Sequence, residues 1–179
     1  MNTAQTSPLA LLQQLEEASL GERAIAFERE FVQSWRGFTF NIEDLNLVVP
    51  FAGGFEILPC GEIQPLPLSR KWVKGMTNIR GEIYTVIDFA QFIGYGPMVS
   101  TRGGNLFLLP DDNLKSALLL DSRISLKTFS QDLSNAEASG FNQALLPFIS
   151  AVLTDESQSW VVINVEVLMK AQSFVNIGR

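Results

Sequence analysis

The sequence predicts a mainly β protein made of two small β-barrels packed together, with helices at its N- and C-terminal ends. Many short apolar or alternating runs follow one another at close spacing, which is typical of small barrels. Short helices are indicated only after Asp88 and Asn164, so the strand–helix alternation of a doubly wound parallel sheet is missing. Two strand-then-helix endings, at 83–94 and 160–169, suggest two similar lobes.

A helical N-terminal arm is predicted over residues 1–35. Ser7 can cap a helix, and Pro8 suits its first position, where the missing N–H is no loss. Leucines then recur near helical spacing until Gly21, and a second helical pattern runs on to Trp35. We expect this arm to pack on the body of the protein, and the alternative is an arm that seeks a partner.

From Phe38 the apolar period changes to two, which indicates strands. Residues 38–42 and 45–49 alternate on either side of an acidic turn, so they predict a hairpin with one face in solvent. A short strand follows over 55–58. Prolines and a glycine then mark an extended connection with no room for a long helix: Pro59, Gly61, Pro65 and Pro67.

The densest apolar stretch predicts a second hairpin, with strands over 76–79 and 83–87 and a turn at Arg80-Gly81. Asp88 is placed to cap the short helix that follows.

Two more hairpins are expected in the second half of the chain. One joins 106–109 to 116–120, and the other joins 148–153 to 160–163. Asn164 is placed to cap a closing helix.

The composition narrows the possible functions. The chain has 179 residues, a formal net charge of −6 and no histidine. Without imidazole there is no Ser-His-Asp or Cys-His nucleophile, no His-ligated zinc or haem, and no phosphohistidine. The acidic balance argues against broad nucleic-acid binding, which requires Lys and Arg to neutralise phosphates. We therefore expect no metal, no cofactor and no nucleic-acid partner.

The sequence also predicts a soluble, cytoplasmic protein without membrane insertion. Cys60 is the single cysteine, so no internal disulfide is possible, which fits a reducing compartment. The longest uncharged stretch, between Glu137 and Asp155, is interrupted by Pro147 and polar residues and is too broken to span a bilayer. No Lys or Arg precedes Arg23, so the positive region of a secretory signal is missing.

For each candidate catalytic residue, a structural role explains the sequence better than a catalytic one. Asp111 and Asp112 follow an apolar strand, as in phosphoacceptor domains, but they fall in a hairpin turn, where Asp is favoured. Cys60 lies in a Pro/Gly loop of a chain that has no histidine to activate it. No GxxxxGK[ST] motif occurs, and the glycines near Tyr95 fail the dinucleotide pattern. We predict no catalytic residue.

A cluster of cations is more informative. Four cations fall within eleven residues of this acidic protein: Arg70, Lys71, Lys74 and Arg80. Such a local positive face would attract an acidic partner surface, although a solvated face is the alternative. Trp72, Met76 and Ile79 alternate with these charges and could anchor an interface or belong to the core.

The same stretch carries a family resemblance. Residues 74–83 read KGMTNIRGEI and continue into VIDF at 86–89, which resembles the signature of CheW-like chemotaxis coupling proteins. The FEI step at 55–57 and the LLLDSR run at 118–123 are similar to flanking parts of that family. The strand and helix after Trp160 look like its closing elements.

The resemblance implies a CheW-like domain over 36–173 that folds as two SH3-like five-stranded β-barrel lobes. The lobes are expected at about 36–95 and 105–165, with a closing helix at about 165–174. It also implies a non-catalytic adaptor between methyl-accepting chemoreceptors and a CheA-type histidine kinase, in the cytoplasm beside membrane-bound receptor arrays. The additional arm resembles type IV pilus (twitching) couplers more than flagellar ones.

The resemblance also suggests two sets of site residues. Arg80 and Glu56 would lie near a receptor-binding groove between the lobes. Three neighbours complete this receptor set: Ile57, Asn78 and Ile79. The set expected to meet the regulatory domain of the kinase contains Lys71, Lys74 and Gly75. Two other functions stay open: a free-standing relative of the kinase regulatory domain that acts as an inhibitor, and a phosphoacceptor domain.

Overall fold

The structure is a computed structural model that describes residues 34–51, 53–97, 104–111, 114–120, 123–130, 140–155 and 157–178. The chain divides into two units, and the smaller one, Met1–Ser34 with Ser130–Asp132, lies almost wholly outside these residues. So does the predicted N-terminal arm. Its last residue, Trp35, begins a strand and does not end a helix.

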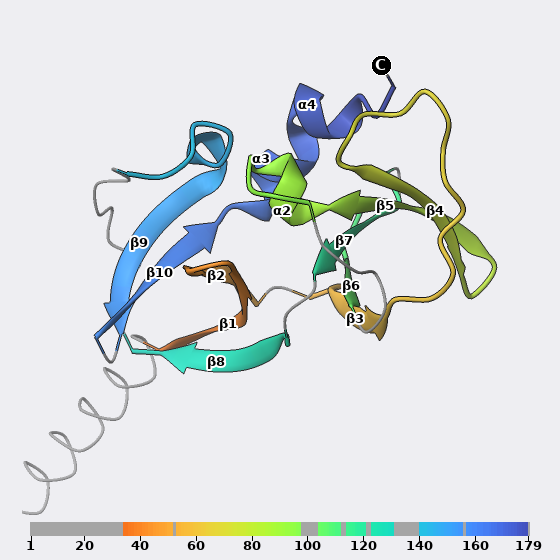
Figure 1. The fold of residues 1–179 in the computed structure, drawn as a ribbon. Coiled ribbons are helices and arrows are strands. Elements are labelled where there is room, and N and C mark those ends of the chain that lie inside the picture. The colour runs from red at the N-terminus through yellow and green to blue at the C-terminus, as the bar shows by residue number, and fades with distance from the viewer. Residues whose placement is uncertain are drawn as a thin grey trace, which may run out of the picture. The chain divides into compact units, whose positions relative to one another are not determined.

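The described part of the larger unit contains two five-stranded sheets (Figure 1). Sheet A has the order β8-β1-β2-β10-β9, with strands β1 (Trp35–Ile42), β2 (Leu45–Pro50), β8 (Ser125–Phe129), β9 (Ile149–Asp155) and β10 (Gln158–Ile163). Sheet B has the order β3-β6-β7-β5-β4, with strands β3 (Glu56–Pro59), β4 (Val73–Ile79), β5 (Glu82–Asp88), β6 (Asn105–Leu108) and β7 (Ser116–Leu120). The predicted mainly β fold with two five-stranded units is confirmed.

The two sheets do not follow the lobe boundaries drawn from the sequence, 36–95 and 105–165. Sheet B is formed by consecutive strands and is inserted between β2 and β8 of sheet A. The reason is a parallel pairing of β2 with β10, in which Val48 lies opposite Val162. This ladder places the first and last hairpins of the chain in one sheet, a long-range contact that local patterns do not reveal.

The central strands are buried on both faces because each sheet has a small core of its own. On β10, Trp160 and Val162 belong to a cluster within sheet A, whereas Val161 and Ile163 face a large cluster that both sheets share. Strand β7 of sheet B alternates in the same way between a private cluster and the shared one. Each sheet therefore curls around its own core, and the two sheets pack against each other through the shared cluster.

In each sheet, contacts link the two end strands or the chain beside them. In sheet A, Lys127 Nζ of β8 lies 2.8 Å from Asp155 Oδ2 of β9. In sheet B, the chain after β3 turns to meet β4, and Gln64 and Met76 exchange two backbone hydrogen bonds of 2.8 Å. These links explain how short, curled sheets protect their edges.

The helices are short, and both predicted caps are present. Asp88 accepts a hydrogen bond from the Gln91 N–H at the start of α2 (Phe89–Phe92), and Asn164 does the same for Val167 in α3 (Val165–Lys170). The closing helix predicted over 165–174 is interrupted at Ala171, so α4 (Gln172–Val175) is separate. A 3-10 turn, η1 (Leu146–Phe148), precedes β9.

Candidate functional site

Three residues of the predicted receptor set, Arg80, Glu56 and Asn78, lie together at the tip of the β4–β5 hairpin. Arg80 and Gly81 form its two-residue turn, both with positive φ, 54° and 88°, as a type I′ turn requires. The Gly81 N–H donates to Asn78 Oδ1 at 3.0 Å. Asn78 therefore shapes the turn that presents Arg80.

An ion pair connects this turn to the far end strand of sheet B. Arg80 Nη1 lies 2.9 Å from Glu56 Oε2 on β3 and donates a hydrogen bond to Oε1 at 3.2 Å. Both side chains are exposed, at 70% for Arg80 and 46% for Glu56. An exposed pair of this kind contributes at most about 1 kcal/mol to stability, so its accessible charges are available to a partner.

A second ion pair lies on the other side of the turn. Lys115 Nζ is 2.6 Å from Glu82 Oε1. The hydrogen bond and the positive charge of Lys115 lower the pKa of Glu82. The hairpin tip thus takes part in two ion pairs. It supplies the positive partner, Arg80, in one and the negative partner, Glu82, in the other.

The remaining predicted receptor residues differ in exposure. Ile57 is exposed on β3, whereas Ile79 is half-buried and packs against the private core of sheet B. Of the predicted set, Arg80, Glu56 and Asn78 come together around the hairpin tip. Ile79 contributes chiefly to the fold.

An apolar groove lies where the chain crosses from sheet A to sheet B, and sequence reasoning missed it. Its volume is about 360 Å³, and its lining includes Val49, Pro50, Phe55, Ile163 and Val165. Phe55 stacks on Phe107 with a centroid distance of 5.0 Å. The sequence signal for this groove was the pair of phenylalanines, Phe51 and Phe55, that flank Gly53-Gly54. Phe55 lines the groove, and Phe51 is 45% exposed beside the crossing.

Two of the predicted kinase residues have structural roles. Lys74 Nζ lies 2.9 Å from Asp88 Oδ2, and the Asp88 side chain is fully buried. Gly75 is buried with φ at +145°, and a Cβ there would clash with the carbonyl group of Gln64. Only Lys71 of this set is exposed on the surface.

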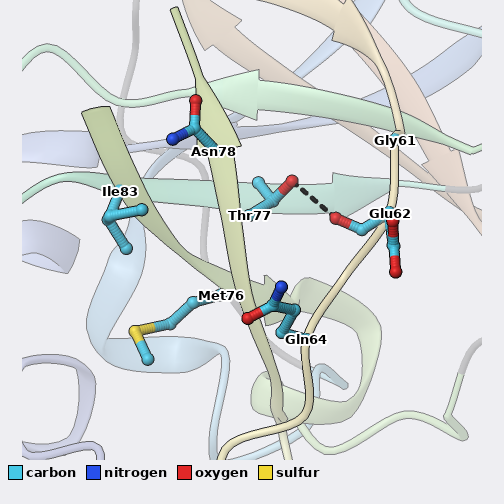
Figure 2. A pocket seen from close by; sticks show the side chains of 7 residues that line it. All are labelled: Gly61, Glu62, Gln64, Met76, Thr77, Asn78 and Ile83. Atoms are coloured by element: carbon cyan, nitrogen blue, oxygen red, sulfur yellow. Dashed lines mark hydrogen bonds between the residues drawn. The ribbon is translucent and has the colours of Figure 1, made fainter. Parts of the chain in front are cut away.

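A shallow pocket of about 430 Å³ lies between the β4–β5 hairpin and the chain that runs past β4 (Figure 2). Met76, Asn78 and Ile83 line the hairpin side. Thr77 Oγ1 donates to the Glu62 carbonyl oxygen at 2.7 Å and links β4 to this chain segment, as the dashed line in Figure 2 shows. The pocket therefore opens next to the hairpin tip.

The other predicted features are structural where they can be seen. Asp111 Oδ1 accepts a hydrogen bond from the Leu114 N–H at 3.1 Å, as expected for a turn, while Asp112 lies outside the described residues. Burial raises the pKa of the Cys60 thiol, which disfavours a thiolate. Among the described residues, no group of three or more Cys, Asp or Glu could hold a metal ion. No helix in that part of the chain is long and apolar enough to cross a membrane.

Two curled sheets, an exposed ion-paired hairpin and an apolar groove define a protein-interaction module. The model of the CheW-like domain matches residues 36–173, and the chain belongs to this family. The family is a non-catalytic scaffolding family, so the prediction that the chain is not an enzyme is confirmed. The predicted resemblance is confirmed as well.

Individual relatives agree with this membership. The chain is 26% identical to protein PilI of Pseudomonas aeruginosa over 151 residues, 84% of each protein. It is 35% identical to protein FrzA of Myxococcus xanthus over 106 residues, 59% of this chain and 65% of FrzA. The crystal structure of the scaffolding protein TtCheW from Thermoanaerobacter tengcongensis superposes with a TM-score of 0.64 at 15% identity. That match covers 78% of this chain and 90% of TtCheW and shows the common fold.

Proposed function

We propose that this chain is an adaptor that couples methyl-accepting chemoreceptors to a CheA-type histidine kinase in a chemosensory array. Membership of a scaffolding family supports a role that depends on contacts alone. The observation that carries the proposal is the exposed Arg80–Glu56 ion pair at the tip of the β4–β5 hairpin. Its charges are accessible to a partner and add little to folding.

The receptor would contact the hairpin tip and the apolar groove. The groove, with its Phe55 and Val165 walls, would take apolar side chains from the tip of a receptor helical hairpin. Arg80 and Glu56 would fix the register of that contact more than its affinity. Ile57, exposed beside Glu56, extends the apolar surface.

The kinase would contact a different surface, around Lys71 in the turn before β4. Lys74 and Gly75 would act there indirectly, since their contacts with Asp88 and Gln64 hold β4 and the preceding loop in place. Two separate surfaces on one small module are what an adaptor requires. Repetition of these weak contacts in an array would bind far more tightly than any single one.

The relatives bear on the pathway. Similarity to PilI over most of the chain supports a role in pilus-based (twitching) motility, with flagellar motility as the alternative. In either case the adaptor would act in the cytoplasm, beside membrane-bound receptors.

Reversing the charge of Arg80 tests the receptor surface. We expect Arg80→Glu to weaken binding of a receptor-tip fragment roughly tenfold. The substitution places two carboxylates, at positions 56 and 80, side by side, so the positive charge that the receptor would meet is lost. Thermal unfolding should be almost unchanged. Isothermal titration of the full chain with receptor-tip and kinase regulatory-domain fragments measures both affinities.

Swapping the pair separates recognition from internal stability. The double variant Glu56→Arg/Arg80→Glu rebuilds the ion pair but inverts the charges that a receptor would encounter, so receptor binding should stay weak. The matched control is Glu82→Lys/Lys115→Glu, which should retain receptor binding. Full recovery in the Glu56/Arg80 swap would remove these two residues from the receptor surface. Binding to the kinase alone would instead favour the inhibitor that the sequence left open.

A further inference from the structure

A single leucine is presented to solvent in an unusual way. Leu68 is 83% exposed, whereas the other exposed large hydrophobic side chains in the described residues are 37% to 53% exposed. Its φ is +56°, in the left-handed region that a leucine rarely adopts. Folding therefore gains nothing from burying this side chain and must overcome backbone strain to hold it.

The turn that carries Leu68 is tightly held on its C-terminal side. Ser69 Oγ donates to the Leu66 carbonyl oxygen at 2.7 Å. The Arg70 N–H donates to the Ile177 carbonyl oxygen, and Arg70 Nε donates to that of Gly178, both at 2.9 Å. Residues 177 and 178 thus hold the turn in place, and these contacts keep Leu68 in its strained backbone conformation.

That fastening is itself anchored in the core. The Arg70 guanidinium lies 5.7 Å from the centre of the Trp72 ring, and Trp72 meets Phe92 edge-on at 5.6 Å. Phe92 in turn contacts Phe174 of α4 at 5.4 Å. A rigid, strained, exposed apolar side chain is the form that a pre-organised interface anchor takes, because little entropy is lost when it binds.

The surrounding charge indicates what the anchor fits. Between residues 63 and 81 the sequence contains four Lys or Arg and no Asp or Glu. Arg70 and Lys71 lie two and three residues after Leu68 and are both exposed. A complementary partner would offer an apolar socket with acidic residues at its rim.

We propose that Leu68 is the apolar anchor of the kinase-facing surface and inserts into an acid-rimmed socket on the kinase regulatory domain. This inference rests on the proposed function, since it assigns Leu68 to the partner expected near Lys71. The new element is Leu68 itself, on the turn that is hydrogen-bonded through Arg70 to Ile177 and Gly178. A receptor tip, a second copy of the chain and an anionic membrane are the other occupants to be tested.

The experiment titrates the full chain with a kinase regulatory domain, a receptor-tip fragment and phosphatidylglycerol vesicles. Leu68→Ser should weaken binding of the kinase domain at least about tenfold and leave receptor binding within about twofold. The matched control is Leu126→Ser, an exposed leucine on β8 of sheet A, which should alter neither affinity. Leu68→Gly should lose the same kinase affinity with a thermal midpoint at or above that of the wild type, because glycine accepts a positive φ.

The outcomes separate the two levels of the proposal. Wild-type protein that binds neither fragment would overturn the proposed function. Wild-type binding of the kinase domain with undiminished affinity in Leu68→Ser would overturn the role of Leu68 and leave the adaptor function standing. The role of Leu68 would also be wrong if its substitution selectively reduced receptor binding, self-association or vesicle binding.

Discussion

Gly75→Ala is expected to destabilise the fold by about 3 kcal/mol, because the site has both a positive φ and no space for a Cβ. The added Cβ would meet the Gln64 carbonyl group, whose oxygen accepts the Met76 N–H. Moving that carbonyl breaks the bridge that joins the two ends of sheet B. Urea unfolding of the variant and the wild type measures the difference in free energy.

Gly81→Ala is the matched control for the Gly75 substitution. Gly81 also has a positive φ, +88°, but a Cβ there meets nothing within 4 Å. Backbone strain alone should cost this variant about 1 kcal/mol. If both alanine variants lost the same small amount, the close approach of Gly75 to Gln64 would have no energetic importance.

Lys74→Met is expected to destabilise the protein by about 3 kcal/mol. The substitution leaves the Asp88 carboxylate fully buried without the ammonium that lies 2.9 Å from it. The N–H of Gln91 still donates to the other Asp88 oxygen, but a hydrogen bond from a neutral N–H compensates only part of the cost of burying a charge. The free energy of unfolding from a urea titration provides the test.

A double variant isolates the charge effect at this site. In Lys74→Met/Asp88→Asn the buried charge is gone and the asparagine can still cap α2, so the double variant should be more stable than Lys74→Met alone. Lys71→Met, on the exposed neighbour, should change stability by about 0.5 kcal/mol or less. A stable Lys74→Met protein with impaired kinase binding would contradict the structural role and return Lys74 to the docking surface.

These two predictions reinterpret the signature run KGMTNIRG. Its first two residues hold β4 against Asp88 and Gln64, and its asparagine shapes the turn. Of its two charged residues, only Arg80 is exposed, and its ion pair with Glu56 is exposed as well. A loss of function at Lys74 or Gly75 should therefore accompany a loss of stability, and one at Arg80 should not.

Local sequence patterns predicted most of the elements because caps and tight turns depend on neighbouring residues. The β4–β5 hairpin, the Asp88 cap and the Asn164 cap are all confirmed. Strand β8 was missed, since only Phe129 of its five residues is buried and the pattern looks polar. The break at Ala171 also left no clear signal.

Long-range contacts were beyond the sequence. Nothing in the local pattern shows that β2 pairs with β10, so the sequence could not show which strands share a sheet. The resemblance brought Glu56 and Arg80 to one region, and the structure adds their direct contact. The partner of Lys74 and the groove beside Phe55 depend on tertiary packing and became visible only in the fold.

The most direct test of the adaptor role is whether one molecule holds both partners at once. Sedimentation velocity of an equimolar mixture of this chain, a kinase regulatory domain and a receptor-tip fragment measures the complexes formed. We expect a ternary complex that disappears when the chain is omitted and that Arg80→Glu reduces to the kinase-bound pair. Mutually exclusive binding of the two fragments, with no ternary species at any concentration, would contradict the account.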